Sequence, residues 1–285
     1  MTTTFESLLR EPGILVLPGV HDALSARIAV RAGARAIYMT GFGVSGASFG
    51  VPDIGIVNAE QMVERVRTIA GITSPVPLIA DGDNGHGGPL NVANLVCAYE
   101  REGAQCIQLE DQVSPKRCGH MEGKDVIPLA EAAAKIRAAV DARHTKTFKI
   151  MARTDARATH DLDEALRRSE AFLKAGADIL FIEALRSEDE LLRAAKTFSG
   201  MPLVANLVED GKTPMLSPMA LQQMGYKIAL YPISAVLVSA AALEQTYARL
   251  LGKPAEPKER VSFAHYNDIV GLSDFLATAK RYEPH

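Results

Sequence analysis

The sequence predicts an α/β fold, a (β/α)8 barrel (TIM barrel) of parallel strands and outer helices with extra helices at its C-terminal end. Short apolar runs recur along the chain, helical patterns separate them, and the runs are nearly continuous in apolar residues, as in parallel strands that are covered on both faces. The eight runs, in order, are GILVLPGV, RAIYMTG, PVPLIADGD, QCIQLED, FKIMARTDA, ADILFIEA, MPLVAN and KIALYP.

The segments between these runs carry apolar residues at helical spacing, and several of them end at a glycine that suits a helix C-cap. They are DALSARIAVRAGA, AEQMVERVRTIAG, LNVANLVCAYEREGA, LAEAAAKIRAAVDAR, LDEALRRSEAFLKAGA and SEDELLRAAKTFSG. We therefore expect a barrel domain over residues 1–252. Residues 253–285, which include SFAHYNDIVGLSDFLATA, are expected to form a C-terminal helical extension.

The composition is that of an ordinary globular protein of 285 residues, 47% of them hydrophobic, with a formal net charge of -3. No long basic run is present, which disfavours a nucleic-acid partner and favours a small-molecule substrate. No apolar run is long enough for a membrane span, and the start lacks the pattern of a secretory signal, so we expect a cytoplasmic protein. Three cysteines without a CxxC spacing fit reduced thiols better than disulfides or structural zinc.

Polar residues follow several strands at the point where each strand ends, which is where barrel enzymes place their chemistry. Asp81 and Asp83 end the third strand at a spacing of two, so their side chains point the same way. Further polar strand ends are Glu110-Asp111, Arg153-Thr154-Asp155, Glu183 and Asn206. An acidic cluster whose donors are all oxygen atoms predicts a hard divalent cation, Mg2+ above all, for which Mn2+ can substitute.

Less specific interpretations exist for these acidic residues. The stretch DGDNGHGG that contains Asp81 and Asp83 could be a glycine-rich turn with solvated aspartates. Either Glu110 or Asp111 could be a helix-capping acid. Because neighbours in a strand face opposite ways, at most one of the two should reach the metal, and we choose Glu110.

The third cysteine, Cys118, lies in the stretch KRCGH, between Lys116-Arg117 and His120. These cationic neighbours favour the thiolate and predict a pKa below that of a free thiol. Gly119 and Gly123 would let the loop move. A chance surface cysteine is the alternative, whereas Cys97 and Cys106, in a helical pattern and a strand, are expected to be packed thiols.

These residues resemble the isocitrate lyase/phosphoenolpyruvate mutase superfamily over nearly the whole barrel, from LPGVHDALSARIAVRAGARAIYMTGFG through FIEALRSEDEL to NLVEDGKTP. The strongest signature is KRCGH, which resembles the catalytic loop of the carbon-carbon lyase branch. The resemblance implies Mg2+ held directly by Asp81, with Asp53, Asp83 and Glu110 acting largely through water. It also implies a homotetramer whose C-terminal helices are exchanged between subunits.

Roles for the remaining residues follow from the same resemblance. The 2-oxo-acid end of the substrate would be bound by Thr40, Gly41 and Phe42, and Arg153 would pair with a substrate carboxylate. The catalytic residues would be Cys118, His120, Lys116, Arg153 and Glu183, and the substrate shell would also include Gly119, Asn206 and Pro232.

The implied reaction is a retro-aldol cleavage of a 2-hydroxy dicarboxylate or tricarboxylate, in which the metal ion binds the end that becomes the 2-oxo acid. The departing carboxylate then needs a proton, and Cys118 is the expected acid.

Two positions separate members of the lyase branch. Lyases that cleave isocitrate or methylisocitrate carry Ser or Thr two residues after the asparagine of strand seven, where this chain has Val208, which cannot donate a hydrogen bond to a third carboxylate. Pro232 stands where oxaloacetate hydrolases of the superfamily carry serine. We therefore expect a Mg2+-dependent lyase for a 2-alkylmalate of the 2,3-dimethylmalate type, which releases a 2-oxo acid such as pyruvate and a carboxylic acid.

The alternatives are 2-methylisocitrate cleavage to pyruvate and succinate, and hydrolysis or decarboxylation of oxaloacetate. Two alternatives belong to other functional classes. One is a Schiff-base aldolase that uses Lys149, and the other is a barrel that binds a ligand without catalysis.

Overall fold

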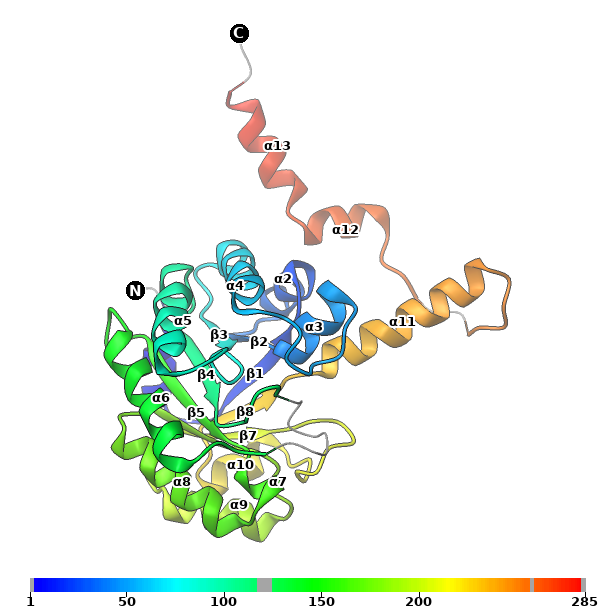
Figure 1. The fold of residues 1–285 in the computed structure, drawn as a ribbon. Helices are drawn as coiled ribbons and strands as arrows, with labels where there is room; N and C mark the ends of the chain where they lie inside the picture. Colours follow the sequence, from blue (N-terminus) through cyan, green and yellow to red (C-terminus); the bar gives the residue numbers. More distant parts are fainter. Residues whose placement is uncertain (1–2, 117–124, 257–258, 283–285) are drawn as a thin grey trace.

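In the computed structural model the chain forms a closed barrel of eight parallel strands, β1 to β8 in sequence order, in which β1 pairs with β8 (Figure 1). The structure describes residues 3–116, 125–256 and 259–282. The strands are β1 (Leu15–Val20), β2 (Ile37–Met39), β3 (Leu78–Asp81), β4 (Cys106–Glu110), β5 (Lys149–Thr154), β6 (Ile179–Ile182), β7 (Leu203–Asn206) and β8 (Ile228–Tyr231). The predicted (β/α)8 barrel is confirmed.

Helices α2 to α10 cover the outside of the barrel, α1 precedes the first strand, and α11 to α13 follow the last one. They are α1 (Phe5–Arg10), α2 (Ala23–Arg31), α3 (Gly41–Phe49), α4 (Ala59–Thr73), α5 (Pro89–Arg101), α6 (Leu129–Ala142), α7 (Ala156–Thr159), α8 (Leu162–Lys174), α9 (Glu188–Thr197), α10 (Pro218–Met224), α11 (Ser234–Leu250), α12 (Phe263–Ile269) and α13 (Leu272–Lys280). In the part of the chain that the structure describes, no helix combines the length and the apolar character that crossing a membrane requires.

The strands alternate between two hydrophobic cores, because successive side chains in a strand point to opposite faces. Outward side chains such as Met39, Ala80 and Ala152 pack beneath the helices. Inward side chains such as Ile79 and Met151 fill the barrel interior. The residues at the strand ends that share the inward direction are therefore the ones whose side chains face the mouth of the barrel.

The short helix α1 packs against the interior core at the end of the barrel where the strands begin. Its Phe5 and Leu8 are buried and belong to the interior cluster. The Phe5 N–H donates to Oε1 of Gln105, the residue before β4, at 2.7 Å. This end is therefore occupied by apolar side chains, and the opposite end is left for the loops that follow the strands.

Figure 1 shows α11 extending outward from the barrel and α13 lying away from it, whereas α12 contacts α2. Neither α11 nor α13 contains a buried residue. Arg31 of α2 forms an ion pair with Asp268 of α12 at 2.6 Å. The boundary between a barrel domain and an extension at residues 252/253 stays a prediction.

Candidate active site

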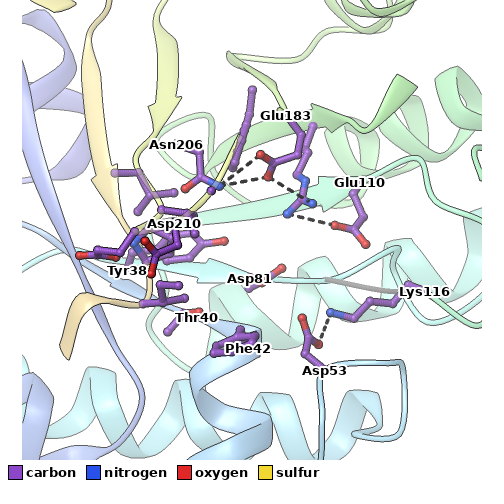
Figure 2. A pocket seen from close by; sticks show the side chains of 18 residues that line it. Tyr38, Thr40, Phe42, Asp53, Asp81, Glu110, Lys116, Glu183, Asn206 and Asp210 are labelled. Atoms are coloured by element: carbon purple, nitrogen blue, oxygen red, sulfur yellow. Dashed lines mark hydrogen bonds and ion pairs between the residues drawn. The ribbon is translucent and has the colours of Figure 1, made fainter. Parts of the chain in front are cut away.

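A cavity of about 260 Å³ opens where the strands end, and its lining side chains come from most of the strands (Figure 2). Tyr38, Asp81, Glu110, Phe181 and Asn206 all line it. Asp81 follows the inward-facing Ile79 at a spacing of two, and Glu110 follows the inward-facing Cys106 at a spacing of four, so the alternation that builds the interior core also directs them into the cavity.

Four carboxylates that the sequence analysis assigns to a metal are buried in or beside this cavity. Asp53, Asp81 and Glu110 line it, and Asp83 lies next to Asp81. Asp81 is held by two backbone amides, since Gly41 N–H donates to its Oδ2 at 3.1 Å and Asp83 N–H to its Oδ1 at 3.0 Å. A Cβ on Gly41 would lie 2.8 Å from Asp81 Oδ2, so a glycine permits this close approach. Gly41 also begins α3, and a helix N-terminus favours a carboxylate.

The pKa values of these acids reflect their burial. Burial, followed by the charge of Asp83, raises the pKa of Asp81 to about 6. Burial raises the pKa of Glu110 well above its usual value, against the opposing effect of Arg153. The pKa of Asp53 is raised by burial too, although Lys116 opposes the shift. Burial therefore destabilises the charged forms of these carboxylates, and a bound cation would offset that loss of free energy.

The ammonium group of Lys116 lies among these carboxylates. Its Nζ pairs with Asp53 Oδ1 and, at 2.5 Å, with Asp83 Oδ1 (Figure 2 draws the pair with Asp53). Burial alone would lower the pKa of Lys116, but the carboxylates, led by Asp83, raise it well above its usual value. Lys116 is therefore an internal cation of the cluster. Asp83 borders a neighbouring cavity, which it shares with Lys116.

Arg153 lies beside the metal-side carboxylates and contacts three acids. Asp155 accepts from its Nε and Nη2 at 2.9 and 3.0 Å, while Glu110 and Glu183 each lie 3.3 Å from one of its nitrogen atoms. Burial alone would lower the pKa of Arg153, but these acids, led by Asp155, raise it well above its usual value. The guanidinium also lies over the ring of Phe181, 5.2 Å from its centroid. A fixed cation thus faces the cavity.

The remaining wall combines apolar and acidic residues. Phe42, Val208, Leu230, Pro232 and Ile233 line it, and so do Glu209 and Asp210. Glu183 and Asn206 border this wall, and Asn206 Nδ2 donates to Glu183 Oε2 at 3.1 Å. The cavity therefore offers charged groups to the acidic parts of a ligand and a hydrocarbon surface to the rest.

Comparison with known proteins identifies the family of this chain. The model of the phosphoenolpyruvate phosphomutase family matches residues 5–251. The chain belongs to this family. The predicted membership of the isocitrate lyase/phosphoenolpyruvate mutase superfamily is thereby confirmed.

Several relatives of the chain are named lyases. The chain is 42% identical to 2,3-dimethylmalate lyase of Eubacterium barkeri, over 96% of each chain. It is 39% identical to 2-methylisocitrate lyase of Bacillus subtilis (strain 168), over 85% of this chain and 79% of the relative.

Solved structures of family relatives have the same barrel. A 2,3-dimethylmalate lyase, described as a member of the PEP mutase/isocitrate lyase superfamily, superimposes with a TM-score of 0.91 at 34% identity over 99% of this chain and 96% of that chain. Oxaloacetate acetylhydrolase in complex with 3,3-difluorooxalacetate gives 0.91 at 33% identity, over 98% and 96%. Phosphonopyruvate hydrolase in complex with oxalate and Mg2+ gives 0.84 at 31% identity, over 97% of each chain.

The side chains present fit the metal that the family implies. Among the described residues, no group of three His, Cys, Asp or Glu side chains is arranged to bind an ion unaided. The donors are nevertheless oxygen atoms, and the buried Glu110 Oε1 has no hydrogen-bond partner in the described part of the chain. Since Mg2+ keeps several waters and takes few direct carboxylates, a cluster that reaches it partly through water suits this ion.

The remaining predicted site residues have different positions. Thr40 and Pro232 line the cavity, whereas Gly41 contributes its backbone amide beside it. Cys118, Gly119 and His120 lie outside the described residues, so their predicted roles stay predictions. Lys149, the alternative Schiff-base lysine, begins β5 at the opposite end of the barrel.

One residue of the cavity, Tyr38, was not among the predicted site residues. Its hydroxyl donates to Gln108 Oε1 at 2.5 Å, and burial, followed by the charge of Asp81, raises its pKa well above the usual value. Its position two residues before Thr40 on an inward register is the sequence signal that could have found it.

Proposed function

We propose that the protein is a Mg2+-dependent carbon-carbon lyase that cleaves a 2-hydroxy dicarboxylate of the 2-alkylmalate type into a 2-oxo acid and a carboxylic acid. The observation that carries the proposal is the arrangement of one cavity, which has buried carboxylates on one side, the Arg153 guanidinium beside them and a cluster of apolar side chains elsewhere, next to Glu209 and Asp210. Relatives named 2,3-dimethylmalate lyase and 2-methylisocitrate lyase support the assignment to the lyases.

The ion would be held by Asp81 directly and by Asp53, Asp83 and Glu110 largely through water. When bound, Mg2+ supplies Lewis-acid stabilisation to the oxygen atom on carbon 2 of the substrate. Asp81 is already oriented by the amides of Gly41 and Asp83, so little rearrangement of this ligand is needed. Lys116 pairs with Asp53 and Asp83 and would hold both carboxylates in place beside the ion.

The protein side chains bind and orient the rest of the substrate. Arg153 offers its cavity-facing nitrogen atoms to a substrate carboxylate. Asn206 and Glu183, joined by a hydrogen bond, limit where the reacting carbon lies. The bond between carbons 2 and 3 breaks, the hydroxyl loses its proton, and carbon 3 of the departing acid gains one. Cys118 is the proposed donor of that second proton, with His120 stabilising the thiolate.

The apolar wall favours alkyl groups over a further carboxylate. Val208, Leu230, Pro232 and Ile233 give hydrocarbon contacts that suit the methyl groups of a substrate such as 2,3-dimethylmalate. A third carboxylate against these groups would lose hydrogen bonds to water without replacing them. Because 2-methylisocitrate carries a third carboxylate, it is the second candidate and not the first. Oxaloacetate is the third, because a structural relative acts on it.

A substrate panel tests the proposal. We expect release of a 2-oxo acid from 2-alkylmalates in the presence of Mg2+, slower release from 2-methylisocitrate, and no release after EDTA treatment. Cys118→Ser should abolish cleavage while Mg2+ binding, measured by calorimetry, is retained. Undiminished cleavage in EDTA, or oxalate release from oxaloacetate as the fastest reaction, would overturn the assignment.

We also propose that the protein is a homotetramer whose C-terminal helices pack on neighbouring copies. Val238, Leu243 and Tyr247 of α11, and Phe275 and Leu276 of α13, are 54 to 70% exposed in the single chain. Such clusters of exposed apolar side chains on helices favour a protein partner. Sedimentation should give four times the chain mass, and Leu243→Glu with Phe275→Glu should reduce it. A monomeric parental protein would contradict the proposal.

A further inference from the structure

Arg153 is tied to Asp155 along one edge of its guanidinium. The two contacts, Nε to Oδ2 at 2.9 Å and Nη2 to Oδ1 at 3.0 Å, form a two-pronged pair, and both side chains are buried. Arg153 and Asp155 are two residues apart at the end of β5, a spacing that directs both side chains to the same side. With this pair in place, Nη1 faces Glu110, and Nη2 is shared between Asp155 and Glu183.

Asp155 is itself held by a buried network that begins on the outer helix layer. Asp111 accepts from the Asp155 N–H at 2.9 Å and from Thr154 Oγ1 at 2.8 Å. Arg168 of α8 donates to Asp111 Oδ2 at 3.1 Å and to the Ile127 carbonyl at 2.8 Å. A continuous series of charge-assisted contacts thus runs from α8 to the guanidinium in the cavity.

Arg153 has other acidic partners nearby, which explains why Asp155 has to hold the Nε and Nη2 side of the guanidinium. Glu110 and Glu183 each lie 3.3 Å from a guanidinium nitrogen, longer than the Asp155 contacts. Without Asp155, the guanidinium would be free to turn and pair more closely with either acid. That pairing would compete both with a substrate carboxylate and with the proposed metal role of Glu110.

We propose that Asp155 is a positioning residue that fixes the Arg153 guanidinium for binding a substrate carboxylate, and that Asp111 and Arg168 fix Asp155. This proposal rests on the proposed function, in which Arg153 binds that carboxylate. Asp155 acts through Arg153 and has no need to touch the substrate. It adds a residue to the substrate-binding machinery that strand-end position alone did not assign to a role.

The first test is Asp155→Asn, which keeps the size of the side chain but removes its charge. We expect KM for the 2-alkylmalate to rise at least about tenfold, while kcat falls less than about threefold, because a binding group is misplaced. The matched control is Asp178→Asn, which breaks the pair between Asp178 and Arg143 Nη1 (2.6 Å) at the other end of the strands. The control should change KM less than about twofold.

A double-mutant cycle separates positioning from a general structural effect. Arg153→Gln alone should raise KM strongly. If Asp155 acts through Arg153, adding Asp155→Asn to that variant should change KM no further. Multiplication of the two single effects, or an equal rise of KM in Asp178→Asn, would overturn the proposal.

A measurement without turnover keeps this test independent of the substrate. The Nε–H of Arg153 should give a nitrogen-15 NMR resonance protected from solvent exchange, which disappears in Asp155→Asn and persists in Asp178→Asn. If the parental protein cleaves no member of the substrate panel, the proposed function fails. If instead the Arg153 resonance exchanges freely in the parental protein, the positioning role of Asp155 fails.

Discussion

The two ends of the barrel are built from the same eight strands but bury different kinds of side chain. At the end where the strands begin, α1 brings Phe5 and Leu8 into the interior core. At the end where they finish, Asp81 and Glu110 are buried almost as completely, at 7% and 5% exposure. Burial of apolar groups stabilises the fold, whereas burial of charges costs free energy unless partners offset it. Stability and chemistry are therefore separated along the barrel axis.

The strongest test of this separation is Asp81→Asn at the mouth of the barrel. We expect kcat/KM to fall at least about a thousandfold, because the only proposed direct ligand loses its charge. Calorimetric Mg2+ binding should weaken in parallel. Asp163→Asn removes an exposed carboxylate that pairs with Arg193 and should leave both quantities unchanged. An Asp81→Asn variant with one tenth or more of the parental activity would refute the metal assignment.

The reverse pattern is expected at the other end of the barrel. Phe5→Ala should lower the free energy of unfolding by about 3 to 5 kcal/mol, because it leaves a cavity in the interior core. Below the unfolding temperature, kcat/KM should change less than about twofold. Leu9→Ala, at a partly buried neighbour of the same helix, should cost less. Urea unfolding in EDTA measures the free energy of unfolding of both variants. A large loss of activity at unchanged stability would show that the two ends are coupled.

The sequence predicts the end of the barrel that carries the chemistry better than the end that carries α1. Strands are readable as apolar runs, and the predicted strand ends Asp81 and Glu110 do line the cavity at the mouth. The alternation of side chains along a strand separates Glu110, which lines the cavity, from Asp111, which contacts Thr154 and Arg168. These inferences need only local periodicity.

Contacts between distant segments are what the sequence did not provide. Asp53 lies in the loop between α3 and α4, and only the closed barrel brings it to Lys116. Its place near the metal was inferred from family resemblance and not from spacing. The helix α1 has six residues, which is too short for a clear apolar period, so its packing against the interior core was not predicted.

The pH dependence of the metal-free protein should distinguish the two ends further. The pKa of Asp81 is raised to about 6, so the folded state binds its proton more tightly than the unfolded state. The contribution of Asp81 to stability is therefore present at low pH and is lost as the pH rises from about 4 to about 6, by at most about 3 kcal/mol. Urea unfolding in EDTA should show a smaller loss in Asp81→Asn than in the parental protein and in Phe5→Ala, because Glu110 and Asp53, whose pKa values are also raised, still contribute to it. Equal pH profiles for all three would contradict the assigned pKa.

The smallest expected effect concerns the apolar wall of the site, at Val208. Val208→Thr keeps the shape of the side chain and adds a hydroxyl group that can donate to a third carboxylate. One such hydrogen bond contributes about 1 kcal/mol, so kcat/KM for 2-methylisocitrate should rise about fivefold relative to a 2-alkylmalate. Val208→Ala, which enlarges the cavity without adding a donor, should not reproduce the gain. If the alanine variant shows the same shift in the ratio, the volume of the cavity, and not hydrogen bonding at this position, separates dicarboxylates from tricarboxylates.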